Sequence, residues 1–168
     1  MKDAQLYYSD LKNEPVQLTY SLLSEMETLL GEIDVVIDEE IMYDIAERLR
    51  YHINVSDNGE LVFYPDKLLD NGENCFDLYF KNVKDPQADA VLIDSGVRSY
   101  VVDKTSAVVF YAKGNEEGVT VYKYNIEDGS VVEICTDVYS YYLSDDGKTL
   151  ISWVWTIVFM SAVPKMKK

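Results

Sequence analysis

FDLYFKNVKD at residues 76–85 and VTVYKYNIED at residues 119–128 are two copies of one pattern, and AQLYYSDLKN at residues 4–13 is a third. Between them lie copies of a second element: SDNGELVFY at 56–64, SAVVFY at 106–111 and SDDGKTLI at 144–151. A unit of roughly forty residues therefore recurs, and it is made of short apolar strands and polar turns. A period of this size predicts an array of β-units rather than one continuous sheet.

The repeat predicts a mainly β fold, an incomplete or open propeller-like array of four-stranded antiparallel units. The chain of 168 residues is expected to form a single repeat domain over 1–168. Its expected parts are a half unit at 4–20, a two-helix insertion at 21–50, full units at 51–94 and 98–136, and a partial unit at 139–168 with an atypical apolar tail. Closed propellers hold about four to eight units, so an array of about three predicts an open arc.

Within the units, the expected strands are 51–55, 60–64, 76–82, 88–94, 98–103, 107–112, 119–125, 131–136, 139–143 and 148–152. Asp57-Asn58-Gly59 suits a hairpin turn, because Asn and Gly tolerate positive φ. Residues 65–74, rich in Asp, Asn and Gly, are expected to form a loop. Helical periodicity replaces the strand pattern at 21–50, where Ser24 and Glu27 fit a capping box.

The amino-acid composition limits the classes of partner that the protein is expected to bind. Thirty acidic and fifteen basic residues give a net charge of −15, which argues against nucleic acid and against an anionic membrane surface. The first residues lack the apolar segment of a signal peptide. Cys75 and Cys135 stand in no metal-binding or redox spacing, so we expect small buried side chains, with a disulfide as the alternative.

The C-terminal segment departs from the rest of the chain. No Asp or Glu follows Asp146, and the run from Leu150 to Pro164 is apolar. Three interpretations are open: a buried strand or strand pair, a membrane anchor shorter than the roughly 20 residues that a spanning helix needs, or a segment foreign to the repeat, as after a change of reading frame.

The spacing of Ser144 to Leu150, together with Leu78-Tyr79 and Val121-Tyr122, resembles the propeller repeats of the TolB-like and WD40-like families. The likeness is closest to Tyr- and Asp-rich propeller proteins of the envelopes of gut Firmicutes. It covers residues 51–152 and part of 4–20, whereas 21–50 and 153–168 depart from it. The resemblance implies a bacterial protein of the cell envelope or the extracellular space with a non-catalytic binding role.

No pattern of catalytic residues is present in the sequence. His52 is the one histidine, no Gly-x-Ser-x-Gly motif occurs, and the acidic turns match no EF-hand loop. We therefore expect no enzyme activity, no catalytic or metal-binding residues and no cofactor. An accessory propeller domain of a hydrolase, with its catalytic part outside this chain, is the alternative.

The expected binding surface is aromatic. Four tyrosines begin predicted strands near one rim, where exposed rings would stack on sugars or grip a peptide: Tyr100, Tyr139, Tyr141 and Tyr142. The alternative is that these rings pack between the units. The predicted function is a non-catalytic binding or scaffolding module for a protein or glycan partner. Two chains that share their half units would close one ring, so a homodimer is a further hypothesis.

Overall fold

In the computed structural model, the described residues are 6–9, 11–12, 14–19, 52–69, 75–85, 87–115, 118–144 and 149–154. They form β-strands and loops, and within them no helix is present that could cross a membrane. The mainly β fold predicted from the sequence is confirmed. The predicted helical insertion at 21–50 and the end of the tail, from residue 155 on, lie outside the described residues.

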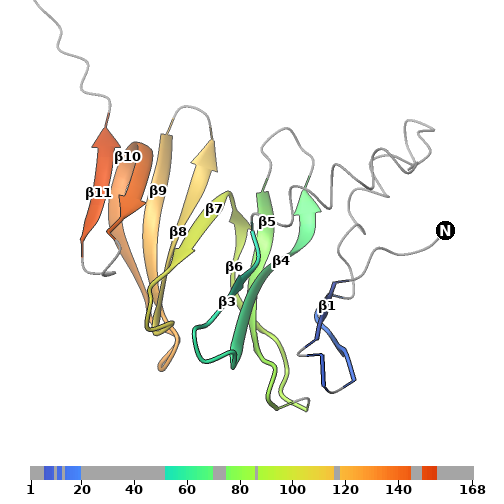
Figure 1. Cartoon of the computed structure of the whole chain (residues 1–168). Coiled ribbons are helices and arrows are strands. Elements are labelled where there is room, and N and C mark those ends of the chain that lie inside the picture. The colour runs from blue at the N-terminus through green and yellow to red at the C-terminus, as the bar shows by residue number, and fades with distance from the viewer. Residues whose placement is uncertain are drawn as a thin grey trace, which may run out of the picture.

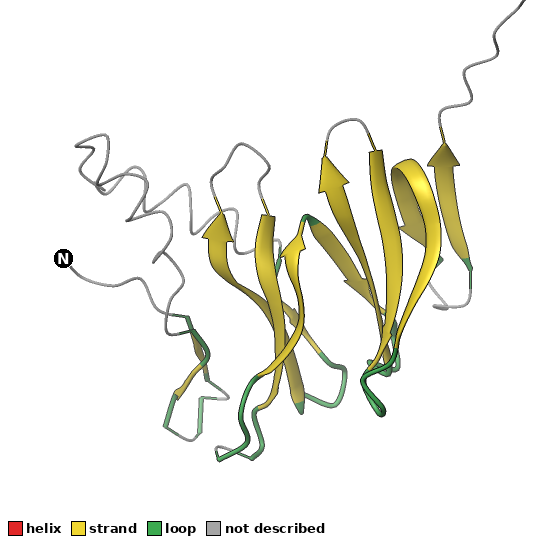
Figure 2. Ribbon diagram, turned by 180° about the vertical axis from the view of Figure 1, so that it is seen from behind, coloured by secondary structure: helices red, strands yellow, loops and turns green. Residues whose placement is uncertain are grey.

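The strands form three antiparallel sheets, which lie side by side in chain order (Figures 1 and 2). The N-terminal hairpin pairs β1 (Tyr7–Tyr8) with β2 (Val16–Gln17). The middle sheet has the order β3 (Asn54–Val55), β4 (Leu61–Leu69), β5 (Cys75–Asn82) and β6 (Val91–Val97). The C-terminal sheet has the order β7 (Ser99–Val102), β8 (Val108–Asn115), β9 (Gly118–Asn125), β10 (Val131–Leu143) and β11 (Leu150–Val154).

The repeat is visible in the direction that each strand's side chains take. On β4, Val62 and Tyr64 pack against the N-terminal hairpin, while Phe63 between them belongs to the core shared with the C-terminal sheet. Val-Phe-Tyr recurs on β8, where Val109 and Tyr111 face the middle sheet. Corresponding residues therefore point toward the preceding unit in both sheets, because successive side chains of a strand alternate between its faces. Two antiparallel meanders, of four and five strands, stacked in this way define an incomplete propeller-like array.

The middle and C-terminal sheets share one apolar core, whose buried members are Phe63, Phe76, Leu78, Ile93, Val97, Tyr100, Val109, Tyr111 and Tyr124. Polar contacts join the same two sheets. The Tyr111 hydroxyl donates to Asp94 Oδ2 at 2.9 Å, and the Lys113 ammonium donates to Asp94 Oδ1 at 2.9 Å. Both donors come from β8 and the acceptor comes from β6, so these bonds fix the position of one sheet on the other.

A loop of one design follows the first strand of the middle and C-terminal sheets, and recurs between β10 and β11. In each loop the residue at its start donates its N–H to a carbonyl five residues on, and its side-chain oxygen accepts the N–H of that residue. The starting residues are Ser56, Asp103 and Ser144. Gly59 has a φ of 67°, which confirms the expected turn, and Ser106 takes the corresponding place with a φ of 55°.

Two segments differ from the sequence prediction. The loop expected at 65–74 is wrong for its first half, because β4 continues through Pro65 to Leu69. Only Phe63 and Val62 of β4 pair with β3, so Pro65 lies where β4 has lost that partner and its missing N–H costs no ladder bond. The strands expected at 131–136 and 139–143 are joined in the single strand β10. Cys75 and Cys135 form no disulfide with each other or with another described residue; Cys75 is buried and Cys135 is half-buried.

Candidate functional site

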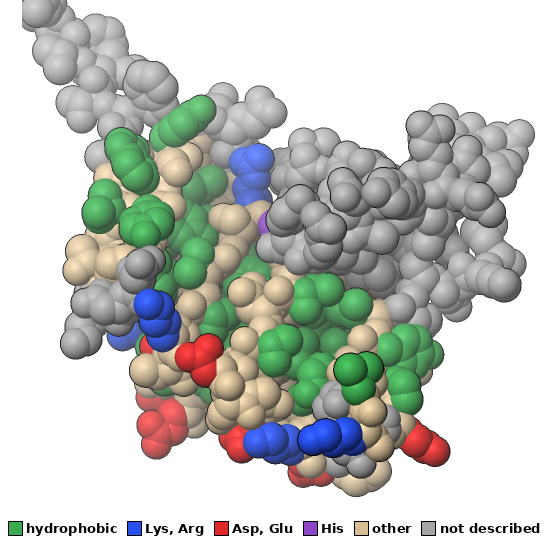
Figure 3. Space-filling model, viewed as in Figure 1, with side chains coloured by type: hydrophobic (Ala, Val, Ile, Leu, Met, Phe, Trp, Pro, Cys, Tyr) green, Lys and Arg blue, Asp and Glu red, His purple; other side chains and the backbone are tan. Residues whose placement is uncertain are grey.

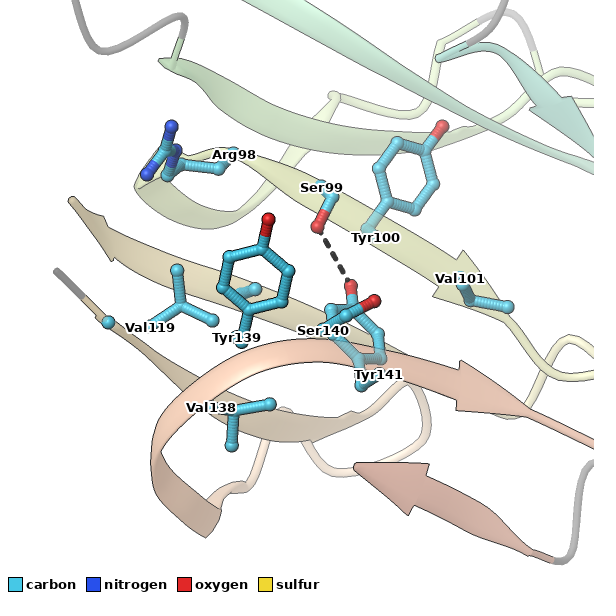
Figure 4. Close-up of a pocket in the computed structure, with 11 residues that line it drawn as sticks. Arg98, Ser99, Tyr100, Val101, Val119, Val138, Tyr139, Ser140 and Tyr141 are labelled. Carbon is cyan, nitrogen blue, oxygen red and sulfur yellow. Dashed lines mark hydrogen bonds between the residues drawn. The ribbon is translucent and has the colours of Figure 1, made fainter. Parts of the chain in front are cut away.

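A cavity of about 790 Å³ lies on the face of the C-terminal sheet that points away from the middle sheet (Figure 4). Strands β7, β8 and β9 form its floor, and the second half of β10 forms its opposite wall. Its lining residues are Arg98, Ser99, Tyr100, Val101, Ala112, Gly118, Val119, Val138, Tyr139, Ser140 and Tyr141. The volume falls within the range of pockets that hold small organic ligands.

The opposite wall exists because β10 curls over the sheet at its middle (Figures 1 and 4). The register between β10 and β9 shifts between Glu133 and Cys135 and again between Cys135 and Val138. Asp137 has a φ of 55°, which turns the strand where the second shift occurs. Gly118 lies directly beside this turn, because a Cβ atom added there would be 3.4 Å from Asp137 Cα, an ordinary van der Waals contact.

The floor of the cavity is hollow because the C-terminal sheet has small side chains at positions where the middle sheet has large ones. In the sequence repeat that opens at Phe76 and at Val119, the C-terminal sheet has Val119 and Val121 where the middle sheet has Phe76 and Leu78. Phe76 and Leu78 fill the space between the middle and C-terminal sheets. Of these two smaller residues, Val119 lines the cavity, so the short side chain at this position leaves room between β9 and the curled strand.

One hydrogen bond spans the cavity. Ser99 Oγ on β7 and the Tyr141 hydroxyl on β10 lie 3.1 Å apart, and either can donate (Figure 4). Burial raises the pKa of the Tyr141 phenol, so this hydroxyl stays protonated at neutral pH. Tyr139, two residues earlier on the same face of β10, is 68 % exposed and borders the opening. Arg98 brings the one charged side chain among the lining residues.

The structure brings the rings of two of the four nominated tyrosines to the cavity, while the ring of Tyr100 packs in the core shared with the middle sheet. Tyr139 and Tyr141 project from β10 toward β7, and Tyr100 belongs to the cavity lining while being only 8 % exposed. The Tyr100 hydroxyl donates to the carbonyls of His52 and Phe63, and burial raises the pKa of this phenol well above its ordinary value. Tyr142 is 50 % exposed and lies on the other face of β10.

Sequence reasoning missed the non-aromatic lining. Arg98, Ser99 and Val101 are on β7, and Val119 is on β9, so no local motif connects them. The one available signal was the exchange of large for small side chains between the copies at 76–85 and 119–128.

Other polar groups have structural partners. The His52 ring packs on Phe76, with 5.1 Å between ring centroids, and burial lowers the pKa of this imidazole. In the part of the chain that the structure describes, no three His, Cys, Asp or Glu side chains gather as metal ligands would. The cavity can therefore offer aromatic contact, hydroxyl hydrogen bonds and one positive charge.

A second surface feature lies at the C-terminal side of the array. Apolar side chains gather there over β10 and β11 (Figure 3), and the largest exposed ones include Tyr142, Ile151 and Trp153, the last 55 % exposed. β11 is the last strand of its sheet and pairs on one side with β10.

Comparisons with known proteins give distant structural likenesses. No protein-family model matches the sequence, and no curated protein matches it. Among solved structures, the β-propeller domain of the Trilobed protease from Pyrococcus furiosus, described as having an open velcro topology, is 17 % identical with a TM-score of 0.43. The match covers 60 % of this chain and 34 % of that one.

Two further solved structures are similar at the same distant level. The acylaminoacyl peptidase of Pyrococcus horikoshii is 11 % identical with a TM-score of 0.42, over 55 % of this chain and 15 % of that one. A candidate 6-phosphogluconolactonase from Bacteroides uniformis is 12 % identical with a TM-score of 0.37, over 61 % of this chain and 32 % of that one. The chain thus spans about a third or less of the lengths of the structures that it matches.

Proposed function

We propose that this chain is a non-catalytic binding module of the propeller type, and that it binds a partner in the cavity between β7 and the curled half of β10. The observation that carries the proposal is the cavity itself, a hollow of about 790 Å³ bordered by tyrosines on the open face of the last sheet. Tyr and Arg are the residue types that most often dominate binding surfaces.

The chemistry of the lining supports binding rather than turnover. None of the lining residues is Asp, Glu, His or Cys. Hydrolysis by an acid–base pair or by a serine or cysteine nucleophile needs such a side chain at the reacting atoms. Ser99, the hydroxyl that could serve as a nucleophile, is bonded to Tyr141 rather than to a base.

The proposal includes two finer points. The chain is related to TolB-like and WD40-like envelope propellers, and its partner is a protein or a glycan. This part of the proposal rests on the repeat of the sequence and on the stacked sheets of four and five strands. Under this reading the cavity takes the place where a further unit would pack in a complete propeller.

A ligand screen by nuclear magnetic resonance tests the proposal. Pools of oligosaccharides and of short peptides are added to the ¹⁵N-labelled protein, and amide shifts are followed for Ser99, Val101 and Ala112. We expect at least one pool to give saturable shifts at these residues with no product signals. Product formation would reveal an enzyme, and unchanged spectra with every pool would contradict the proposal.

A further inference from the structure

We propose that the cavity of the C-terminal sheet recognises an acidic sugar, with the carboxylate of a uronic acid bound by Arg98 and its ring lying against Tyr139. This inference rests on the proposed binding function and adds the chemical class of the ligand.

Arg98 supplies the charge. It lies at the end of the cavity where β7 begins (Figure 4), and its backbone N–H donates to the Ala112 carbonyl at 2.9 Å, which fixes its position at the start of the strand. The chain has twice as many acidic as basic residues, yet among the described residues no carboxylate forms an ion pair with Arg98. A guanidinium left without a carboxylate in so acidic a chain is suited to accept one from a ligand, in the bidentate geometry that the planar group favours.

Hydroxyl groups supply the next contacts. Ser99 and Tyr141 share one hydrogen bond at 3.1 Å, in which one hydroxyl donates and the other keeps its proton free to donate elsewhere. Ser140 is also among the lining residues. Such groups both donate and accept, which matches the hydroxyls of a sugar better than the apolar side chains of a peptide.

The aromatic ring supplies the apolar contact. Tyr139 is 68 % exposed at the border of the cavity. Tyrosine presents a large, rigid surface with little entropy to lose on binding. Val101, Ala112 and Val119 add apolar residues to the floor.

The strand pairing limits where an extended peptide could add to the sheet. β8 and β9 are each paired with a strand on both sides, whereas β7 is the edge strand and residues 139–143 of β10 pair with β11 alone. The contacts that this inference uses come from side chains, those of Arg98, Tyr139 and the bonded pair of Ser99 and Tyr141. The net charge of −15 repels anions at long range, but a Debye length of about 8 Å at physiological salt screens distant acids and leaves the Arg98 contact strong.

The test compares two ligands that differ in the carboxylate. A trisaccharide of galacturonic acid and the neutral trisaccharide of galactose are titrated into the full chain at 0.15 M salt and followed by calorimetry and by amide shifts. We expect the acidic sugar to bind at least tenfold more tightly than the neutral one. Arg98→Gln should remove that preference, and Arg98→Lys should restore only part of it because the fork of two donors is lost.

Two further variants separate the site from the fold. Tyr139→Ala should weaken binding severalfold, whereas Tyr142→Ala, an exposed tyrosine on the other face of the same strand, should leave it unchanged. Each variant is kept only if its amide spectrum shows the fold intact.

The outcomes distinguish this inference from the proposed function. Equal binding of both sugars, or an acidic-sugar affinity unchanged in Arg98→Gln, would overturn the inference. The proposed function, a cavity that binds a partner, would still stand. Arg98-dependent binding of an acidic peptide such as triglutamate, without binding of the sugar, would replace the glycan by a protein partner. If no ligand shifted the amide signals of the cavity residues, both the inference and the proposed function would be contradicted.

Discussion

Replacing Tyr100 by phenylalanine should cost the protein about 1–2 kcal/mol of unfolding free energy, although no carbon atom is lost. The ring would still pack in the core shared by the middle and C-terminal sheets, with Phe76 at 6.3 Å between centroids. The variant loses one hydroxyl, which donates to the carbonyl of His52 and, at 3.1 Å, to that of Phe63. A typical buried hydrogen bond contributes about 0.5–1.5 kcal/mol, and carbonyls left without a donor add to the loss.

The assay is urea unfolding followed by far-ultraviolet circular dichroism. With a slope of about 2 kcal/mol per molar urea, the expected loss moves the midpoint by about 0.5–1 M while the slope stays constant. Tyr7→Phe is the matched control, because Tyr7 is 53 % exposed on the N-terminal hairpin, and it should change stability by less than about 0.5 kcal/mol. If Tyr100→Phe proved as neutral as this control, the bond between the two sheets would not exist and their packing would have to be revised.

Three other outcomes follow from the described residues. Gly59→Ala should lower the unfolding free energy by about 1 kcal/mol, and Ser106→Gly should raise it by about 0.5 kcal/mol, because both positions have positive φ. The loss at Gly59 comes from the backbone alone, since an added Cβ there meets no atom within 4 Å. Opposite signs in urea titrations would contradict the shared loop design. Stability should fall above about pH 10, by about 1.4 kcal/mol per pH unit for each of Tyr100 and Tyr111. Burial raises both pKa values in the folded state, which therefore keeps protons that the unfolded chain releases; unfolding curves that do not change between pH 9 and 11 would refute this. The homodimer stays a prediction, and light scattering coupled to size exclusion should give twice the chain mass. If the exposed apolar surface of β11 is the contact, Trp153→Ser should shift the measured mass toward that of the monomer. A wild-type protein that is monomeric at high concentration would refute the homodimer.

The strands were predictable because short apolar segments recur between recurring turns. Val62, Phe63 and Tyr64 are all buried, since the middle sheet has a neighbour on each face, and an unbroken apolar run of this kind is what a strand buried on both sides requires. The copy at Val109 to Tyr111 then fixed the next unit, and the Asn58-Gly59 turn marked the hairpin.

The curl of β10 was not predictable, and the cavity depends on it. Asp137 adopts a positive φ without a glycine or an asparagine to signal it, so residues 131–143 read as two ordinary strands. The tyrosines of the candidate site were nominated by residue type, and Tyr100 shows the limit of that reasoning. Its hydroxyl joins two sheets through carbonyls at His52 and Phe63, about forty-eight and thirty-seven residues away, a relation that one sequence cannot reveal.

The central claim is that β10 folds back over β7 and forms one wall of the cavity in which we propose that a partner binds. Nuclear Overhauser contacts between the ring protons of Tyr141 and the β-protons of Ser99 test it most directly, because the two side chains meet only if the strand curls. The account predicts these contacts, together with ordinary cross-strand contacts between Tyr111 and Tyr122 of β8 and β9. Cross-strand contacts between β8 and β9 without any contact from Tyr141 to Ser99 would contradict it.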